Sequence, residues 1–535
     1  MGASSPRSSE PTGAVAWQSR ALAWLHRASA SSVGLRNVRL LMDSGTEIGG
    51  SPTLPPADDV LDRPDAGAKV IRGGAIRAAA YGATILLTAA TVPLMTRHLG
   101  VADFGRFVTA SSIVMIVAGI TEFGLSGIGT REYALAAPAD RRALLANLLG
   151  LRSALTVAGL AVATLLMVLG DYPKVVVVGM LVSGLGLMLL NVQQTYSIAL
   201  TAQLDWGIAS VFELVNAIVV AAGTVLLVLI GAQLFPFFLV SVASSAAALL
   251  VSAIYLRDRV SLLPLFDIPA WRAMVRDALP FAAAATVGIL YPRVGLILVS
   301  LIANAEQTGY YSTAFKIVEV VGGTSGLIAS SAFPLFARAG RDDHERLRYA
   351  VGKVGDTALL AGGYVTLSLI VAAPFVVGVI GGKSFAPAVP VLRLQAVALL
   401  GGFLAATWSY TLLSLRLHGA LLRVTLAGLV ASIALSAALV PSLGAEGASI
   451  ASAVCEFVVA GGYMFALARS PARLRPSLSL LPRAALAAGA AACALLLPVA
   501  NIAQWAVASV VYLGLLALLR AFPAELLQLL PRRAG

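Results

Sequence analysis

Charged residues are scarce in this chain of 535 residues. Asp, Glu, Lys and Arg together make up 12% of it, whereas soluble domains carry about 25%. Hydrophobic residues make up 59%, and the mean hydropathy is +0.88. This composition excludes a soluble globular protein and predicts an integral membrane protein.

Residues that build disulfide, metal and nucleotide sites are also few. The two cysteines, Cys455 and Cys493, both fall inside apolar runs, so we expect small buried side chains there rather than a disulfide or a metal site. No phosphate-binding GxxxxGKS/T loop occurs, so ATP-driven transport by this chain alone is not expected, and no cofactor is predicted. The four histidines show no metal-ligand spacing: His26, His98, His344 and His418.

The formal net charge of +12 does not indicate nucleic-acid binding, because the basic residues lie mostly in short segments between apolar runs. From Arg63 onward, 26 Lys and Arg fall in segments on one side of the predicted membrane. Five fall on the other side: Arg97, Arg106, Lys174, Lys383 and Arg393. The positive-inside rule therefore predicts a multi-pass protein of the inner (cytoplasmic) membrane with both termini in the cytoplasm.

Residues 1–70 differ from the rest, because they are rich in Ser, Pro, Gly and Asp and have no sustained periodicity. We predict a disordered cytoplasmic tail there. Within it, residues 14–27 place Trp17 and Trp24 on one helical face, so a helix on the membrane surface is the alternative. No apolar core suits a cleavable signal peptide, and a start at Met42 is a further alternative.

Fourteen apolar runs of about 20 residues follow, each long enough to span roughly 30 Å of hydrocarbon as a helix. We therefore predict an all-α fold with about 14 transmembrane helices. They cover residues 75–96, 105–125, 149–169, 175–198, 211–231, 235–255, 278–302, 309–335, 355–380, 388–413, 422–440, 447–468, 482–499 and 502–521. The outer loops, such as GDYPK, are too short to fold as domains, so any function must lie among the helices.

Two similar segments indicate an internal repeat. GRFVTASSIV (105–114) and GYYSTAFKIV (309–318) share Gly, Thr, Ala, Ile and Val at matching positions, with an offset of 204 residues. Transporters often consist of two related halves, so we predict two pseudo-symmetric six-helix lobes plus two C-terminal helices. The expected domains are an N-lobe over 71–260, a C-lobe over 261–470, and the C-terminal pair with a short tail over 471–535.

The first two helices and parts of the second half carry motifs of a known transporter superfamily. In the first half these are RHLG (97–100), DFG (103–105), EFGL (122–125) and TREYA (130–134). In the second half they are GYYSTAFKIVEVV (309–321), FPLFAR (333–338) and GAEGASIASAVCE (444–456). Over about residues 73–470 the chain resembles the polysaccharide flippases of the multidrug/oligosaccharidyl-lipid/polysaccharide (MOP) exporter superfamily.

This resemblance implies two six-helix lobes around a central cavity that opens alternately to each side of the membrane. It implies a transporter without enzymatic activity, whose substrate is a polyprenyl-pyrophosphate-linked oligosaccharide moved from the inner to the outer leaflet. Such a flippase supplies O-antigen, capsule or exopolysaccharide assembly, so a polysaccharide polymerase and chain-length machinery are the implied partners. The resemblance, and not the composition, supplies this substrate.

Three charged residues are expected in one layer inside the membrane. Arg293 lies roughly 13 Å below the outer end of its predicted helix, and Lys316 and Glu319 lie roughly 10 and 15 Å below the start of the next. A charge at such a depth costs roughly 2.5–3.5 kcal/mol on insertion scales, so it needs compensation. Pro292 lacks a backbone donor and predicts a kink beside Arg293.

Two interpretations of this layer remain open. In one, Arg293 and Glu319 form an ion pair that joins two helices, and Lys316 extends toward the outer surface. In the other, Arg293 and Lys316 line the central cavity and attract the substrate's pyrophosphate, since even a paired Glu319 leaves one positive charge. The second interpretation makes these two cations the predicted substrate-binding residues.

Other polar residues within the predicted helices are weaker candidates. Glu122 is expected to pair with Arg131 or with water, and coupling-ion binding is its alternative role. Glu456 lies deeper and has no partner nearby in sequence, so it is a candidate site for a coupling proton, with H⁺ or Na⁺ as the possible coupling ion. Three amides either line a sugar path or hydrogen-bond neighbouring helices: Asn191, Gln193 and Gln194.

Three other functions compete with polysaccharide flipping. A lipid-linked peptidoglycan precursor flippase belongs to the same superfamily. A multidrug or toxin extruder would be expected to carry acidic rather than basic cavity residues. A membrane-bound polysaccharide polymerase or ligase would need a sizeable outer loop with catalytic side chains, and the short outer loops argue against it.

Overall fold

The computed structural model describes residues 66–122, 124–137, 139–203, 205–256, 264–476 and 479–521. Residues 1–65, most of the predicted tail, lie outside this range. The last part of that tail is not irregular, because the first described helix already begins at Ala66. The described residues contain helices and connecting turns but no β-strand.

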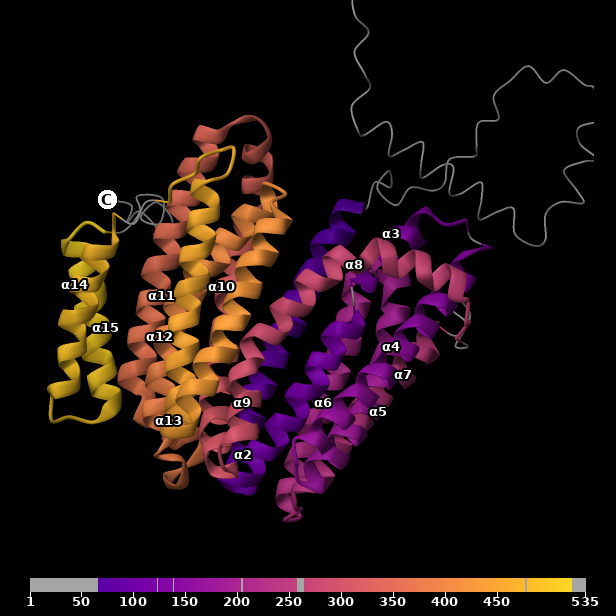
Figure 1. Cartoon of the computed structure of the whole chain (residues 1–535), viewed down its shortest axis with the longest axis horizontal. Coiled ribbons are helices and arrows are strands. Elements are labelled where there is room, and N and C mark those ends of the chain that lie inside the picture. The colour runs from indigo at the N-terminus through magenta and orange to yellow at the C-terminus, as the bar shows by residue number, and fades with distance from the viewer. Residues whose placement is uncertain are drawn as a thin grey trace, which may run out of the picture. The chain divides into compact units, whose positions relative to one another are not determined.

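The helices are long and follow one another closely (Figure 1). In chain order they are α2 (Ala66–Glu122), α3 (Leu125–Leu135), α4 (Arg141–Leu169), α5 (Lys174–Ala202), α6 (Trp206–Leu229), α7 (Leu234–Leu256), α8 (Ile268–Leu290), the 3₁₀ turn η2 (Tyr291–Arg293), α9 (Val294–Ile302), α10 (Ala305–Asp342), α11 (His344–Gly381), η3 (Lys383–Phe385), α12 (Ala388–Ser414), α13 (His418–Ala468), α14 (Leu481–Ala492), η4 (Cys493–Leu496) and α15 (Asn501–Leu518). Ten of the described helices are long and apolar enough to cross a membrane.

Helices α2 and α13 each consist of two segments. The backbone adopts positive φ angles at Gly100 (73°) and Gly444 (55°), a conformation that glycine tolerates and that ends the first segment of each helix. With these breaks, and with α8 and α9 counted as one span, each of the fourteen predicted runs corresponds to a helical segment. The all-α, multi-pass prediction is confirmed, and only the short helix α3 was not expected.

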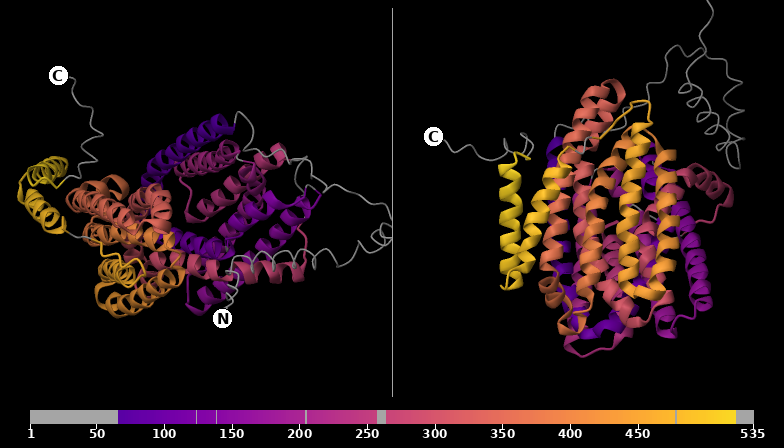
Figure 2. Two further views of the ribbon diagram at one scale, coloured as in Figure 1. Left: turned by 90° about the horizontal axis from the view of Figure 1, so that it is seen from above. Right: turned by 60° about the vertical axis from the view of Figure 1, so that its left-hand side comes forward.

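Two bundles contain most of the buried side chains. Helices α2 to α7 enclose two apolar clusters, which include Tyr196 and Phe238. Helices α9 to α13 enclose the others, and α14 and α15 pack against α11, where the Tyr512 hydroxyl donates to the Leu360 carbonyl at 3.1 Å. Figure 2 shows this last helix pair at the edge of the second bundle.

Helix α8 does not lie wholly in the second bundle. Trp271, Met274 and Val275 near its start pack against the core of the first bundle, and the Leu265 amide just before it donates to the Ala146 carbonyl of α4 at 3.0 Å. After η2, by contrast, α9 buries its residues in the second bundle. The span expected to begin the C-lobe at residue 261 therefore crosses from one bundle to the other.

The two repeat segments lie against each other. A Cβ atom added at Gly105 would lie 2.7 Å from the Gly309 backbone nitrogen, and one added at Gly309 would clash with the Val101 carbonyl. Phe104 and Val108 of α2 are accordingly buried in the core of the second bundle. We call this end of the molecule the junction end, and Figure 1 shows the bundles converging toward it.

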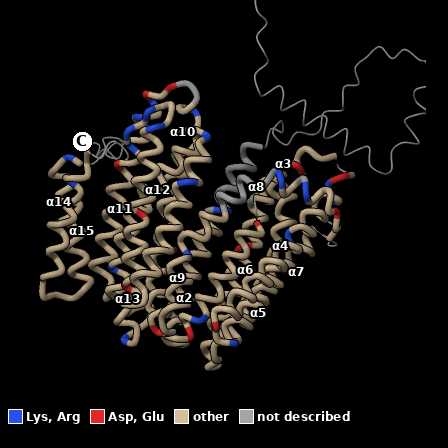
Figure 3. Tube along the Cα trace, in the orientation of Figure 1, with Lys and Arg blue, Asp and Glu red and all other residues tan. Residues whose placement is uncertain are grey.

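Further contacts between the bundles lie at the same end. Arg97 of α2 donates to the Gly378 carbonyl of α11 at 3.0 Å, and the hydroxyls of Tyr172 and Ser300 are 2.7 Å apart. Figure 3 shows Lys and Arg gathered at the opposite end, where α10 meets α11. The two bundles are therefore in contact at the junction end, which has fewer basic residues than the opposite end.

The close contact between Gly105 and Gly309 predicts that a larger side chain at this position would separate the bundles at the junction end. Gly105→Val places a branched side chain against the Gly309 backbone, so we expect the junction end to open. Spin labels on Lys174 and Lys383, which are exposed on opposite bundles at this end, should then report longer distances by pulsed electron resonance in a variant without native cysteines.

The matched control is Gly82→Val on the same helix, since an added Cβ at Gly82 meets no atom within 4 Å. Identical distance distributions for the Gly105 and Gly82 variants would contradict a junction that depends on close glycine packing.

Candidate functional site

Arg293 ends a 3₁₀ turn that interrupts the span from α8 to α9. The turn, Tyr291–Arg293, contains Pro292, which cannot donate a backbone hydrogen bond. The predicted kink is therefore present at this position. Only 8% of Arg293 is exposed, so its guanidinium is held inside the protein and not at its surface.

Arg293 and Lys316 share one carboxylate. The Arg293 Nη2 atom lies 2.7 Å from Glu319 Oε1, and the Lys316 Nζ atom lies 2.8 Å from Glu319 Oε2. Lys316 and Glu319 lie one turn apart on α10, so α10 presents both toward Arg293. The three charges predicted for one layer do lie together, with a net formal charge of +1. Lys316 contacts Glu319 and does not extend alone toward the surface.

The cluster lies where the two bundles meet. Arg293 Nη2 also approaches the sulfur of Met115 on α2, at 3.4 Å. Met115 and Glu319 are separated by 204 residues, the offset of the internal repeat, so one guanidinium contacts equivalent positions of both halves. A movement of one bundle against the other would therefore change the surroundings of Arg293.

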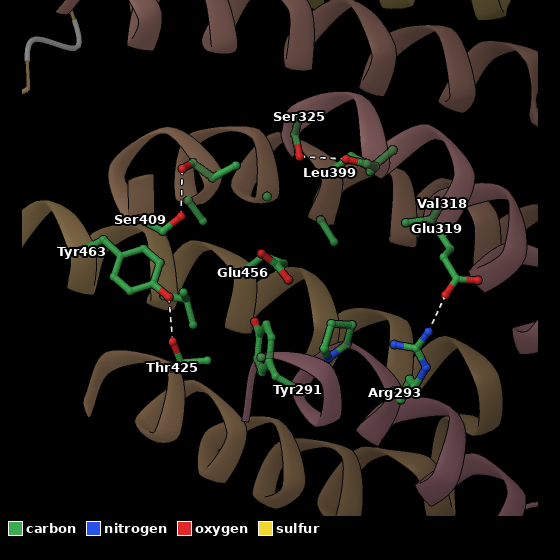
Figure 4. A pocket seen from close by; sticks show the side chains of 18 of the residues that line it. Tyr291, Arg293, Val318, Glu319, Ser325, Leu399, Ser409, Thr425, Glu456 and Tyr463 are labelled. Atoms are coloured by element: carbon green, nitrogen blue, oxygen red, sulfur yellow. Dashed lines mark hydrogen bonds and ion pairs between the residues drawn. The ribbon is translucent and has the colours of Figure 1, made fainter. Parts of the chain in front are cut away.

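A cavity of about 570 Å³ opens beside the cluster (Figure 4). Its charged lining residues are Arg293, Glu319 and Glu456, among the described residues, whereas Lys316 lies outside the lining. The cavity is thus of mixed charge: with the adjoining Lys316 there are two cations and two carboxylates, and only the cluster of Arg293, Lys316 and Glu319 has a net positive charge. Hydroxyl groups cover other parts of the wall: Ser325, Ser409, Thr425 and Tyr463.

Glu456 lies on α13, across the cavity from Arg293. Figure 4 shows the Tyr291 ring and the Glu456 carboxylate pointing toward each other, although the phenol makes no hydrogen bond of good geometry. Nearby, the hydroxyls of Tyr463 and Thr425 are 2.7 Å apart. Glu456 has no ion-pair partner in the described part of the chain, as expected from its isolation in the sequence.

Glu122 has a partner that sequence reasoning missed. Its Oε2 atom lies 2.7 Å from Nη2 of Arg152, which is fully buried, and not beside Arg131. The expected pairing with Arg131 is therefore wrong. Arg152 is one of the 26 basic residues predicted for the cytoplasmic side, but α4 begins at Arg141, so Arg152 lies three turns inside the helix.

The polar groups around Arg152 are hydrogen-bonded mostly to one another. Arg152 also donates to the hydroxyls of Ser126 at 2.6 Å and Thr195 at 3.2 Å. The Ser126 amide donates to Glu122 Oε1 at 3.0 Å. These bonds tie α2, α3, α4 and α5 together, so the geometry fits a structural role in the first bundle.

The candidate sugar-path amides do not line the cavity. Asn191 is buried and donates to the Thr156 hydroxyl at 2.8 Å, and Gln193 donates to Ser197 at 2.9 Å. Gln194 is half-buried. The bonds of the first two match the alternative interpretation, in which such amides hydrogen-bond within and between helices.

Metal-binding groups do not gather in the described residues, where no cluster of three or more His, Cys, Asp and Glu side chains could hold a metal ion. Cys455 is buried as expected. Cys493 is exposed, contrary to expectation, because η4 lies at the end of the peripheral pair α14–α15.

Solved structures with the same fold are transporters. The lipid II flippase MurJ, in an inward closed conformation, matches with a TM-score of 0.70 and 12% identity over 84% of this chain and 99% of that one. An inward-facing multidrug resistance MATE family transporter of the MOP superfamily matches with a TM-score of 0.59 and 14% identity over 72% and 94%. The outward-facing form of such a transporter gives 0.53 with 16% identity over 75% and 95%. At these identities the likeness shows the MOP fold alone.

The sequence itself matches a family model. No curated protein matches the chain. The family model described as "Polysaccharide biosynthesis protein" matches residues 70–339, which is half of the chain and includes α2 to α9 and most of α10. The motifs between residues 97 and 338 and the Arg293 cluster fall within this match, whereas GAEGASIASAVCE (444–456) lies outside it. The chain therefore belongs to the polysaccharide biosynthesis protein family and has the fold of the MOP exporter superfamily.

Proposed function

We propose that this protein flips a polyprenyl-pyrophosphate-linked oligosaccharide across the cytoplasmic membrane for cell-surface polysaccharide assembly. One observation carries the proposal: buried Arg293 and half-buried Lys316 share the single carboxylate of Glu319 beside a cavity. A net positive charge among apolar helices is costly unless it pairs with an anion or reaches water. A pyrophosphate headgroup supplies that anion, while the lipid tail stays in the bilayer.

The proposed orientation follows from the distribution of basic residues. The end rich in Lys and Arg faces the cytoplasm, so both termini lie there, and the junction end faces outward. The substrate then enters from the cytoplasmic side while the bundles are in contact at the outer side. Because Arg293 contacts both α2 and α10, separating the bundles at the junction end exposes the headgroup site to the outside. Alternating access then completes the transfer.

The moving bodies in this scheme are the predicted lobes over 71–260 and 261–470. The span from α8 to α9 packs against the first bundle at its start and lies in the second bundle at its end, so η2 is the point about which α9 turns. The C-terminal pair over 471–535 stays attached to α11. A polysaccharide polymerase and chain-length machinery would receive the flipped product.

The family match favours polysaccharide precursors over the competing substrates. A lipid-linked peptidoglycan precursor also carries a pyrophosphate, so the cation cluster fits it equally, and only the family separates the two. A multidrug extruder is expected to carry acidic cavity residues, so a cluster of net charge +1 does not favour that function. A polymerase or ligase remains disfavoured, because the solved structures with this fold are a flippase and multidrug transporters.

Neutralising both cations tests the headgroup site. We expect Arg293→Ala with Lys316→Ala to reduce polymer export at least about tenfold, since each lost charge-assisted contact is worth roughly 1.5–3 kcal/mol. Export is measured as surface polymer in a deletion strain that expresses each variant, with the amount of protein in the membrane as the reference.

A matched control removes two cations elsewhere, as Lys174→Ala with Lys383→Ala, and should export normally. A second variant, Arg293→Met with Lys316→Met and Glu319→Met, removes all three charges and so leaves no charge of the cluster unpaired. If the pair only joins helices, this variant should restore export. If Arg293 binds the headgroup, export stays low, and restoration would refute the proposal.

Glu456 is the proposed coupling site, because its carboxylate faces the same cavity without an ionic partner. We expect Glu456→Gln to abolish substrate accumulation driven by a proton gradient in reconstituted vesicles. Movement of substrate down its own gradient should persist, since the cation cluster is intact. A sodium gradient imposed at constant pH distinguishes Na⁺ from H⁺ as the coupling ion.

The control for this measurement is Glu446→Gln, an exposed carboxylate on the same helix. Gradient-driven accumulation that survives Glu456→Gln at the level of the Glu446 variant would exclude Glu456 as the coupling residue.

A further inference from the structure

A second cavity, of about 310 Å³, lies at the junction end. One wall comes from α2 and the turn between α4 and α5, and the other from the end of α9 and the start of α10. It shares no lining residue with the Arg293 cavity. Its volume is at the lower end of the range for small-ligand sites. It is therefore a separate space whose walls belong to both bundles.

Thr109 on α2 lines this cavity with an unused hydroxyl. The residue is 2% exposed, and its Oγ1 atom has no hydrogen-bond partner in the described part of the chain. The matching residue of the internal repeat, Thr313, donates to the Gly309 carbonyl four residues earlier, at 2.9 Å. Thr96 and Thr308 form the same kind of bond. Because a hydroxyl that is buried without a hydrogen-bond partner destabilises the protein, Thr109 points to a ligand.

Arg106 lies one turn before Thr109 and lines the same cavity. Its Nη1 atom donates to Asp103 Oδ1 at 2.8 Å, but its buried Nε atom has no partner among the described residues. Residues three apart on a helix present their side chains to the same side. The α2 wall thus offers a guanidinium donor and a hydroxyl next to each other.

The rest of the lining contributes a carboxylate and a phenol from the turn between α4 and α5, and hydroxyls from α9 and α10. Asp171 follows α4 with a φ of 52°, a left-handed conformation that Asp tolerates better than most residues. Next to it, the Tyr172 hydroxyl lies 2.7 Å from that of Ser300. Of the lining residues, Arg106 and Asp171 alone carry charge, so the cavity has no net formal charge.

We propose that this cavity binds one neutral sugar unit of the glycan that the protein transports, which rests on the proposed function. A sugar needs both donors and acceptors around it, and an aromatic ring with hydroxyl, carboxylate and guanidinium groups provides them. A pyrophosphate would instead meet the Asp171 carboxylate, with only one cation to offset it. Because the walls come from both bundles, opening of the junction end dismantles the site and releases the sugar outward.

The test measures sugar binding directly. Full-length protein in lipid nanodiscs is mixed with neutral methyl hexosides and methyl N-acetylhexosaminides, and contacts are followed by saturation-transfer NMR. We expect at least one of these sugars to bind, and Thr109→Val to weaken it roughly five- to tenfold through loss of a hydrogen bond. Arg106→Gln should weaken it similarly, whereas Thr313→Val, the matched control, should not.

The outcomes separate this inference from the proposed function. Sugar binding that is absent, or unchanged in both the Thr109 and Arg106 variants, overturns the inference. The inference is also overturned if inorganic pyrophosphate binds in place of a sugar and its binding depends on Thr109. Arg293→Ala with Lys316→Ala should abolish export and leave sugar binding intact, because the two cavities share no residues. Export that survives in that variant while sugar binding persists defeats the proposed headgroup site and not the sugar site.

Discussion

The carboxylate of Glu319 holds two cations at once, and much of the structure serves to place these three groups together. Lys316 and Glu319 come from one turn of α10, while Arg293 is brought to them by the 3₁₀ turn around Pro292. The close contact of Gly105 with Gly309 brings α2 against α10, so that Met115 completes the surroundings of Arg293. In a medium of low dielectric constant such a cluster persists only with short, well-directed bonds.

Comparison of two buried arginines explains why one is proposed to bind a ligand and the other is not. Arg152 is fully buried and bonds to a carboxylate and two hydroxyls, so little of it remains available to a substrate. Arg293 bonds to a carboxylate that it must share with Lys316, and it lines a cavity. The first arrangement is balanced in charge and joins helices. The second has an excess positive charge next to open space.

Sequence reasoning predicted those features that depend on local pattern. Hydropathy located fourteen spans, Pro292 predicted the kink, and helical rise placed Arg293, Lys316 and Glu319 in one layer. Sequence reasoning failed for those features that depend on tertiary contacts. Hydropathy began this helix at residue 149 and not at Arg141, which placed buried Arg152 at the cytoplasmic end of its helix and gave Glu122 the wrong partner. The crossing of α8 between bundles and the unused hydroxyl of Thr109 depend on contacts between segments far apart in sequence, which no periodicity encodes.

Deletion of the gene would reveal the identity of the lipid-linked cargo. Lipid-linked glycans would be extracted from the deletion strain, identified by mass spectrometry, and assigned to a membrane leaflet by their accessibility to an impermeant reagent. We expect a polyprenyl-pyrophosphate-linked oligosaccharide to accumulate on the cytoplasmic side while peptidoglycan synthesis continues. Accumulation of the peptidoglycan precursor instead, or of no lipid-linked glycan, would contradict the proposed function.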